Sequence, residues 1–128
     1  MSKALLVDTD VMVDFLRGRE HAVKFIRDHA NEIELSCITV AELYAGVRGK
    51  EERKILDDLV CAVPVHPVTP EIAKNGGLFR RDYMKSYNVG LADALIAATA
   101  MAASVGLRTL NVRHFPMLSD VEVPYTRD

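Results

Sequence analysis

Five side chains in this sequence could bind a divalent metal ion, and each stands at the edge of an apolar run. Three are carboxylates, Asp8, Glu42 and Asp93, and two form a polar pair, Asn111 and His114. Carboxylate oxygens without a cluster of His or Cys suit a hard cation such as Mg²⁺ or Mn²⁺. Such an ion lowers the pKa of a bound water and neutralises the charge that develops when a phosphodiester is hydrolysed. These residue types therefore predict metal-dependent hydrolysis.

The three acids must be brought together by the elements that carry them. Asp8 follows the apolar run at residues 4–7, which predicts a strand buried on both faces in a parallel sheet. The carboxyl ends of such strands line the ligand crevice in open α/β sheets. Glu42 and Asp93 lie near the starts of two predicted helices, and the segments before these helices should leave the same edge of the sheet. We therefore expect the three carboxylates to converge.

Each acid also has a purely structural interpretation, which the sequence leaves open. Asp8 or Asp10 could cap the helix that follows. Glu42 lies three residues after Thr39, which is the capping-box spacing, and Asp93 would be favoured in a first turn by the helix dipole. Convergence at one edge of the sheet is what distinguishes a shared metal site from three separate helix caps.

Strands alternate with helices along the chain, which predicts a parallel sheet between helical layers. Apolar, β-prone segments predict strands at residues 4–7, 33–38 and 63–65, the last of them near an edge because prolines flank it, and a final strand that begins at Thr109. Helical spacing predicts helices over residues 11–17, 20–29, 40–47, 51–59, 70–87 and 92–104.

The composition limits the classes of protein that fit. The chain has 128 residues, 49% of them hydrophobic, and a formal net charge of -2, which predicts one ordered domain over residues 1–128. This charge argues against holding nucleic acid by bulk charge alone, although a bound cation could supply positive charge to a nucleic-acid enzyme. Cys37 and Cys61 lie in or beside apolar segments, so we expect buried thiols. Without a recognisable secretory signal or membrane-spanning run, a cytoplasmic protein is expected.

Four segments, in this order, carry a resemblance that extends through almost the whole chain. They are LVDTDV at residues 6–11, ITVAEL at 38–43, LADALIAATA at 91–100 and TLNVRHF at 109–115. Together they resemble the PIN-domain ribonucleases, and specifically the VapC-type toxins of bacterial and archaeal toxin–antitoxin pairs. The resemblance implies a three-layer α/β/α sandwich with a short central parallel sheet.

The resemblance also implies a site and its cofactor. Asp8, Glu42 and Asp93 would form the acidic site that holds Mg²⁺ or Mn²⁺ for RNA cleavage. The family usually places a fourth acidic or polar group after the last core strand, and this chain has Asn111 there. His114 lies nearby and could either protonate the leaving oxygen or pack as a structural residue.

Other positions could contact the substrate. Thr9 and Thr109 match the family's small hydroxyl positions and could steady a water or form structural hydrogen bonds. The basic residues that could meet the RNA backbone are Arg17, Arg80, Arg81, Lys85 and Arg113, of which Arg113 is nearest in sequence to Asn111.

The resemblance implies three partners: an RNA substrate, a cognate antitoxin and a second copy of the chain in a homodimer. Exposed apolar residues in segments 11–16 and 51–59 are candidates for the protein contacts, although the same stripes could be ordinary core faces.

Two other functions stay open. A catalytically silent PIN-like module could bind RNA or protein. The aspartates of residues 8–10 also fit a haloacid-dehalogenase-like phosphatase, with Asp8 as nucleophile and Asp10 as general acid. The phosphatase ranks low because Lys74 and Lys85 are poorly placed and no pair of acids follows a late strand.

Overall fold

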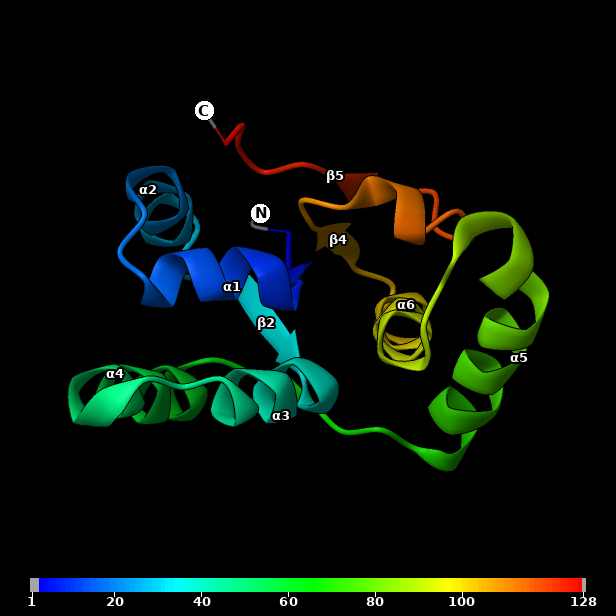
Figure 1. Cartoon of the computed structure of the whole chain (residues 1–128), viewed down its shortest axis with the longest axis horizontal. Helices are drawn as coiled ribbons and strands as arrows, with labels where there is room; N and C mark the ends of the chain where they lie inside the picture. The colour runs from blue at the N-terminus through cyan, green and yellow to red at the C-terminus, as the bar shows by residue number, and fades with distance from the viewer. Residues whose placement is uncertain (1–2, 128) are drawn as a thin grey trace.

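A parallel sheet of five short strands forms the centre of the molecule in this computed structural model, which describes residues 3–127 (Figure 1). The strands lie in the order β3-β2-β1-β4-β5, and every neighbouring pair is parallel. Their carboxyl ends therefore lie at one edge of the sheet. The strands are β1 (Leu5–Val7), β2 (Ile33–Ser36), β3 (Val65–His66), β4 (Gly106–Arg108) and β5 (Val121–Glu122).

Helices cover both faces of this sheet. Figure 1 shows α1 to α4 on one side of the strands and α5 with α6 on the other. This is the α/β/α sandwich that the sequence predicts. The helices are α1 (Thr9–Leu16), α2 (Glu20–Asp28), α3 (Cys37–Ala45), α4 (Gly49–Ala62), α5 (Pro70–Tyr87) and α6 (Leu91–Ala103), and a short 3-10 helix, η1, spans Val112–His114.

The two apolar layers follow from the alternation of side chains along β1. Leu5 and Val7 join the core cluster beneath α1, α2, α3 and α4, whereas Leu6 joins the cluster beneath α6. Successive residues of a strand point to opposite faces, so a strand between two helical layers must be apolar at every position. That requirement explains the uninterrupted apolar run before Asp8.

The start of α3 differs from the prediction. Ser36, and not Thr39, is the N-cap residue, and its hydroxyl accepts a hydrogen bond from the Thr39 backbone N–H at 3.0 Å. The helix begins at Cys37, so Glu42 lies in its second turn and cannot form the capping box that one interpretation required. Ser36 also ends β2, which means that strand and helix meet without a loop.

The last two strands also differ from the prediction. β4 ends at Arg108, so Thr109 follows the core strand and does not begin it, and the two-residue edge strand β5 was not predicted. The register pairs Leu107 with Val121, which places β5 beside β4. A strand of two residues is too short to show alternation in sequence.

The prediction of buried thiols was wrong. Cys37 and Cys61 are both exposed free thiols, because each lies on the solvent side of its helix. In segment 11–16, for which the sequence left a contact surface and a core face open, Val11 and Met12 are fully buried core residues, whereas Val13 and Phe15 are partly buried. Ile55 on α4 is exposed, as the second candidate segment requires. Among the helices of residues 3–127, none is long and apolar enough to cross a bilayer.

Candidate active site at the carboxyl edge of the sheet

Asp8 lies where two central strands end. It follows β1 directly and is the N-cap residue of α1, with its Oδ1 accepting a hydrogen bond from the Thr9 backbone N–H at 2.8 Å. Its Oδ2 accepts a hydrogen bond from the Thr109 hydroxyl at 2.7 Å, and Thr109 follows the neighbouring strand β4. Asp8 is therefore both a helix cap and a buried carboxylate fixed at the edge of the sheet; its exposed fraction is only 5%.

The surroundings of Asp8 disfavour its negative charge. Burial is the largest cause, and the charges of Asp10 and Asp93 add to it, so that the pKa of Asp8 rises to about 7. The hydrogen bonds from Thr109 and Thr9 act in the opposite direction but do not compensate. A carboxylate that is buried beside two other acids would be stabilised by a bound cation.

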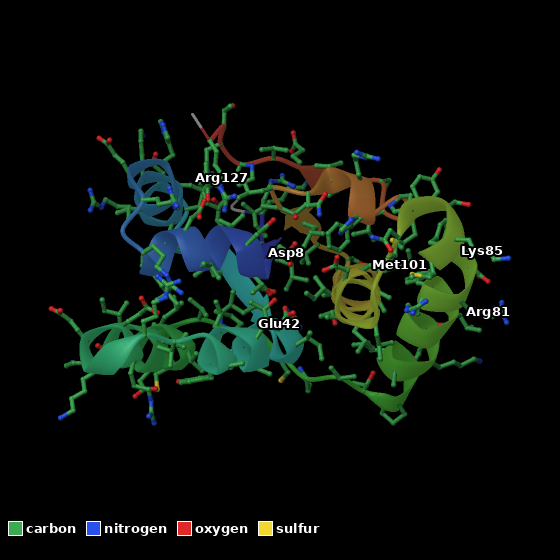
Figure 2. The ribbon with its side chains drawn as sticks, viewed as in Figure 1. Asp8, Glu42, Arg81, Lys85, Met101 and Arg127 are labelled. Atoms are coloured by element: carbon green, nitrogen blue, oxygen red, sulfur yellow. The ribbon has the colours of Figure 1, made fainter. Side chains whose placement is uncertain are left out.

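Glu42 approaches Asp8 through Thr9. Its Oε1 accepts a hydrogen bond from the Thr9 hydroxyl at 2.6 Å, and that hydroxyl lies 3.1 Å from Oγ1 of Thr39. Figure 2 shows Glu42 extending from α3 toward the start of α1, where Asp8 lies. Glu42 is exposed, so its carboxylate borders solvent at the same edge of the sheet.

Asp93 lies in the first turn of α6 and contacts the segment after β4. Its Oδ2 is 3.0 Å from Nδ1 of His114, and the same Nδ1 is 2.9 Å from Nδ2 of Asn111. One ring nitrogen cannot donate to Asp93 and accept from Asn111 at once, so these two contacts belong to alternative tautomers of the His114 ring. The charge of Asp93 acts on Asp8, which places both acids in one electrostatic environment.

Asp10, which the sequence offered as a helix cap or as the general acid of a phosphatase, has a positioning role in the structure. Its Oδ1 accepts a hydrogen bond from the Val11 backbone N–H at 2.8 Å, and its Oδ2 accepts one from the Leu110 backbone N–H at 3.0 Å. These bonds tie α1 to the segment that carries Asn111. Burial raises the pKa of Asp10, although the hydrogen bonds oppose it. Because both oxygens face N–H donors, Asp10 is a poor general acid, which disfavours the phosphatase alternative.

The predicted basic residues do not all approach this edge. Arg113 is exposed on η1 and lines a hollow of about 270 Å³ with Asn111 and His114. Arg17, at the far end of α1, forms an ion pair with Glu52, and Arg81 extends from the outer side of α5 (Figure 2). A larger hollow of about 580 Å³ lies at the opposite edge of the sheet and contains none of the candidate site residues.

The donor set fits a hard divalent cation that keeps much of its water. Within the described residues, no three Asp, Glu, His or Cys side chains stand close enough to form a complete metal site. Mg²⁺ seldom needs one, because it is usually bound through one or two carboxylates and several waters. Burial, together with the charges of Asp10 and Asp93, raises the pKa of Asp8, and a bound cation would favour its charged form. Asp8, Asp93 and Glu42 supply suitable oxygen donors.

Comparison with known proteins gives the family. A family model described as PIN domain matches residues 5–114. Ribonuclease VapC19 of Mycobacterium tuberculosis (strain H37Rv) is 41% identical, with 94% of this chain and 98% of that protein covered. Ribonuclease VapC10 of the same strain is 39% identical over 94% of this chain and 92% of that protein.

Solved structures agree with this comparison. A toxin–antitoxin complex from Klebsiella pneumoniae contains a chain with a TM-score of 0.81 and 24% identity, over 95% of this chain and 98% of that one. FitAcB from Neisseria gonorrhoeae gives a TM-score of 0.73 and 26% identity, over 94% and 97% of the two chains. From its sequence matches and its fold, the chain belongs to the PIN-domain family and, within it, to the VapC ribonucleases.

Proposed function

We propose that this chain is the toxin of a type II toxin–antitoxin pair, acting as a single domain that hydrolyses RNA phosphodiesters with Mg²⁺ or Mn²⁺. The observation that carries the proposal is the buried carboxylate of Asp8, which is fixed between two strand ends and has a pKa raised to about 7 beside Asp10 and Asp93. A bound divalent ion would supply an activated water and neutralise charge on the reacting phosphate.

The chain's own residues would hold the reacting groups in place. Asp8, Asp93 and Glu42 would bind the ion, and the hydroxyls of Thr109 and Thr9 orient two of these carboxylates. Such positioning matters because catalysis depends on groups that are already placed for the transition state. These assignments follow the positions of the family's acidic residues and the contacts described above.

Asn111 and Arg113 would act on the substrate side of the same edge. Asn111, in the fourth position of the site, borders His114 and through it Asp93. Arg113 is exposed and lines the adjoining hollow, where its guanidinium could bind a backbone phosphate. We assign Asn111 to the site and Arg113, with Thr9 and Thr109, to substrate positioning.

The proposal includes protein partners. The similar structures are described as a toxin–antitoxin complex and as VapBC bound to DNA, which supports a cognate antitoxin for this chain. A homodimer is proposed from the family resemblance, with the exposed Ile55 of α4 as one candidate contact. Because the proposed substrate is cellular RNA, we also propose a cytoplasmic location.

Removing one carboxylate tests the proposed site. We expect Asp8→Asn and Asp93→Asn each to reduce Mg²⁺-dependent cleavage of single-stranded RNA by at least about 100-fold, with fold retained, because metal ligation is lost while side-chain size is kept. Cleavage is measured on labelled RNA with and without EDTA, and folding by circular dichroism. Asp58→Asn is the matched control, since Asp58 is exposed on α4. The site assignment is wrong if both site variants cut RNA like the parent.

A further inference from the structure

Four arginines gather around one hollow at the far end of α1. The hollow has a volume of about 550 Å³ and lies between the end of α1, the start of α4 and the C-terminal segment. Arg17 is the C-cap residue of α1 and Arg48 the N-cap residue of α4. Arg19 and Arg127 complete the basic lining, and Figure 2 shows Arg127 above α1, at the opposite end of the molecule from α5.

The positive charge of this hollow is only partly balanced. Asp14, whose side chain is 3% exposed, accepts hydrogen bonds from Nε and Nη2 of Arg127 at 2.8 and 2.7 Å, and Nε of Arg19 lies 3.3 Å from it. Glu52 forms an ion pair with Arg17 at 2.6 Å. Among residues 3–127, Arg48 has no ion pair. Four guanidinium groups thus face two carboxylates, in a chain whose formal net charge is -2.

The guanidinium groups of Arg127 and Arg19 are held by Asp14 and remain accessible. Asp14 fixes Arg127, yet 55% of the Arg127 side chain is exposed, and 65% of the Arg19 side chain is exposed. A guanidinium has five N–H donors in a planar fork that matches phosphate oxygens. Donors that are already positioned lose less conformational entropy when they bind a ligand. The hollow is therefore suited to phosphate groups.

The helix α1 links this hollow to the carboxylate edge. Asp8 is its N-cap residue and Arg17 its C-cap residue, so at 1.5 Å per residue the two ends are roughly 14 Å apart. For a strand with stacked bases, which rises ~3.4 Å per nucleotide, that distance corresponds to about four nucleotides. Sites for single-stranded nucleic acid commonly span ~4–16 nucleotides. One RNA strand could therefore contact both ends of α1.

We propose that Arg17, Arg19, Arg48 and Arg127 form an exosite, a binding site remote from the reacting bond, for backbone phosphates of the RNA that is cut at the carboxylate edge. This inference rests on the proposed ribonuclease function. An acidic protein segment would also carry negative charge. The distance along α1 favours a ligand that extends from the carboxylate edge to the hollow and carries charges at regular intervals, as an RNA strand does.

Salt dependence of RNA binding tests the exosite without requiring cleavage. The probe is a fluorescent polyuridylate of about 12 nucleotides, within the range of single-strand sites, and its affinity is measured in EDTA at several KCl concentrations. Arg19→Ala and Arg48→Ala are compared with the parent, because Arg19 is largely exposed and Arg48 has no side-chain ion pair in the described region. Arg81→Ala is the control, since Arg81 extends from α5 at the other side of the molecule (Figure 2).

We expect each exosite variant to bind the probe about 3- to 10-fold more weakly at low salt and to reduce the salt slope by ~0.7 per lost phosphate contact, with Arg81→Ala unchanged. Parent-like slopes in both variants, with intact RNA binding, would overturn the exosite and leave the ribonuclease proposal standing. Weaker binding of polyglutamate with unchanged RNA binding would assign the hollow to a protein partner instead. A parent that neither binds nor cuts RNA would overturn both proposals.

Discussion

Two threonine hydroxyls organise the candidate site at the scale of single residues. Thr109 donates to Asp8 and Thr9 donates to Glu42, at 2.7 and 2.6 Å. Hydrogen bonds to a charged acceptor are stronger than neutral ones, and here they fix the orientation of the two carboxylates. The sequence identified both threonines as hydroxyl positions, but only the structure shows which carboxylate each one contacts.

The raised pKa of Asp8 predicts a pH-dependent stability of the metal-free protein. Its folded pKa of about 7 exceeds the unfolded value of 3.8, so between these values the folded state binds the extra proton. The free energy of unfolding should therefore fall as pH rises through this window. Asp8→Asn should remove the contribution of Asp8 to this slope and stabilise the metal-free protein at pH 8 by on the order of 2 kcal/mol.

Urea unfolding in EDTA at pH 5 and pH 8 measures this effect. Asp58→Asn, on the exposed face of α4, is the control and should keep the slope of the parent. Equal pH slopes in the parent and in Asp8→Asn would contradict the proposed environment of Asp8.

Between elements, the tightest helix contact depends on a glycine. A Cβ atom at Gly76 of α5 would lie 2.5 Å from Cδ2 and 3.1 Å from Cα of Leu95 on α6. Real Cβ atoms essentially never come as close as 2.5 Å to another heavy atom, and 3.1 Å to a backbone atom is tighter than most Cβ contacts, so a side chain at position 76 would force Leu95 or the two helices to shift. This contact supports α6, which carries Asp93.

Gly76→Ala should therefore destabilise the protein by roughly 1–3 kcal/mol, because Leu95 or the two helices must shift. Gly77→Ala is a matched control in the same helix, since nothing lies within 4 Å of a Cβ placed there. The control should stabilise the protein slightly, by up to about 1 kcal/mol, through helix propensity. Thermal unfolding compares the two variants, and an equal effect of both would contradict the packing argument.

Across the whole molecule, one buried acid joins the two ends of the chain. Asp14 in α1 accepts hydrogen bonds from the Tyr125 hydroxyl and from the Arg127 guanidinium, more than 110 residues away in sequence. Burial opposes its charge, but these hydrogen bonds and the charges of Arg127 and Arg19 outweigh burial and hold the pKa of Asp14 below its usual value. Nothing in the sequence singles out Asp14, because its partners are distant along the chain.

This contact predicts a loss of stability in acid. The folded pKa of Asp14 lies below the unfolded value of 3.8, so the stabilisation is present above that value and is lost as pH falls through the folded pKa. Asp14→Asn should lower the free energy of unfolding at pH 7 by roughly 2 kcal/mol and have less effect near pH 3. Asp28→Asn, which alters an exposed pair with Lys24, should change little at either pH. Urea unfolding at both pH values distinguishes these outcomes.

The sequence by itself determined the fold class and the identity of the candidate acids. Uninterrupted apolar runs and helical spacing are local patterns. They predict strands and helices well because an element buried on one or two faces needs apolar side chains at regular intervals along the chain. Four motifs in order then indicated the PIN family, which the family model and the relatives confirm.

Only the tertiary structure decided how these residues meet. Strand order places Thr109 beside Asp8 across 101 positions of sequence, and α3 brings Glu42 to Thr9. The structure also shows that Cys37 is exposed, that Ser36 is the N-cap residue of α3, and that four arginines line one hollow with Asp14. Contacts of this kind depend on register and on packing between distant segments, which no local pattern of residues encodes.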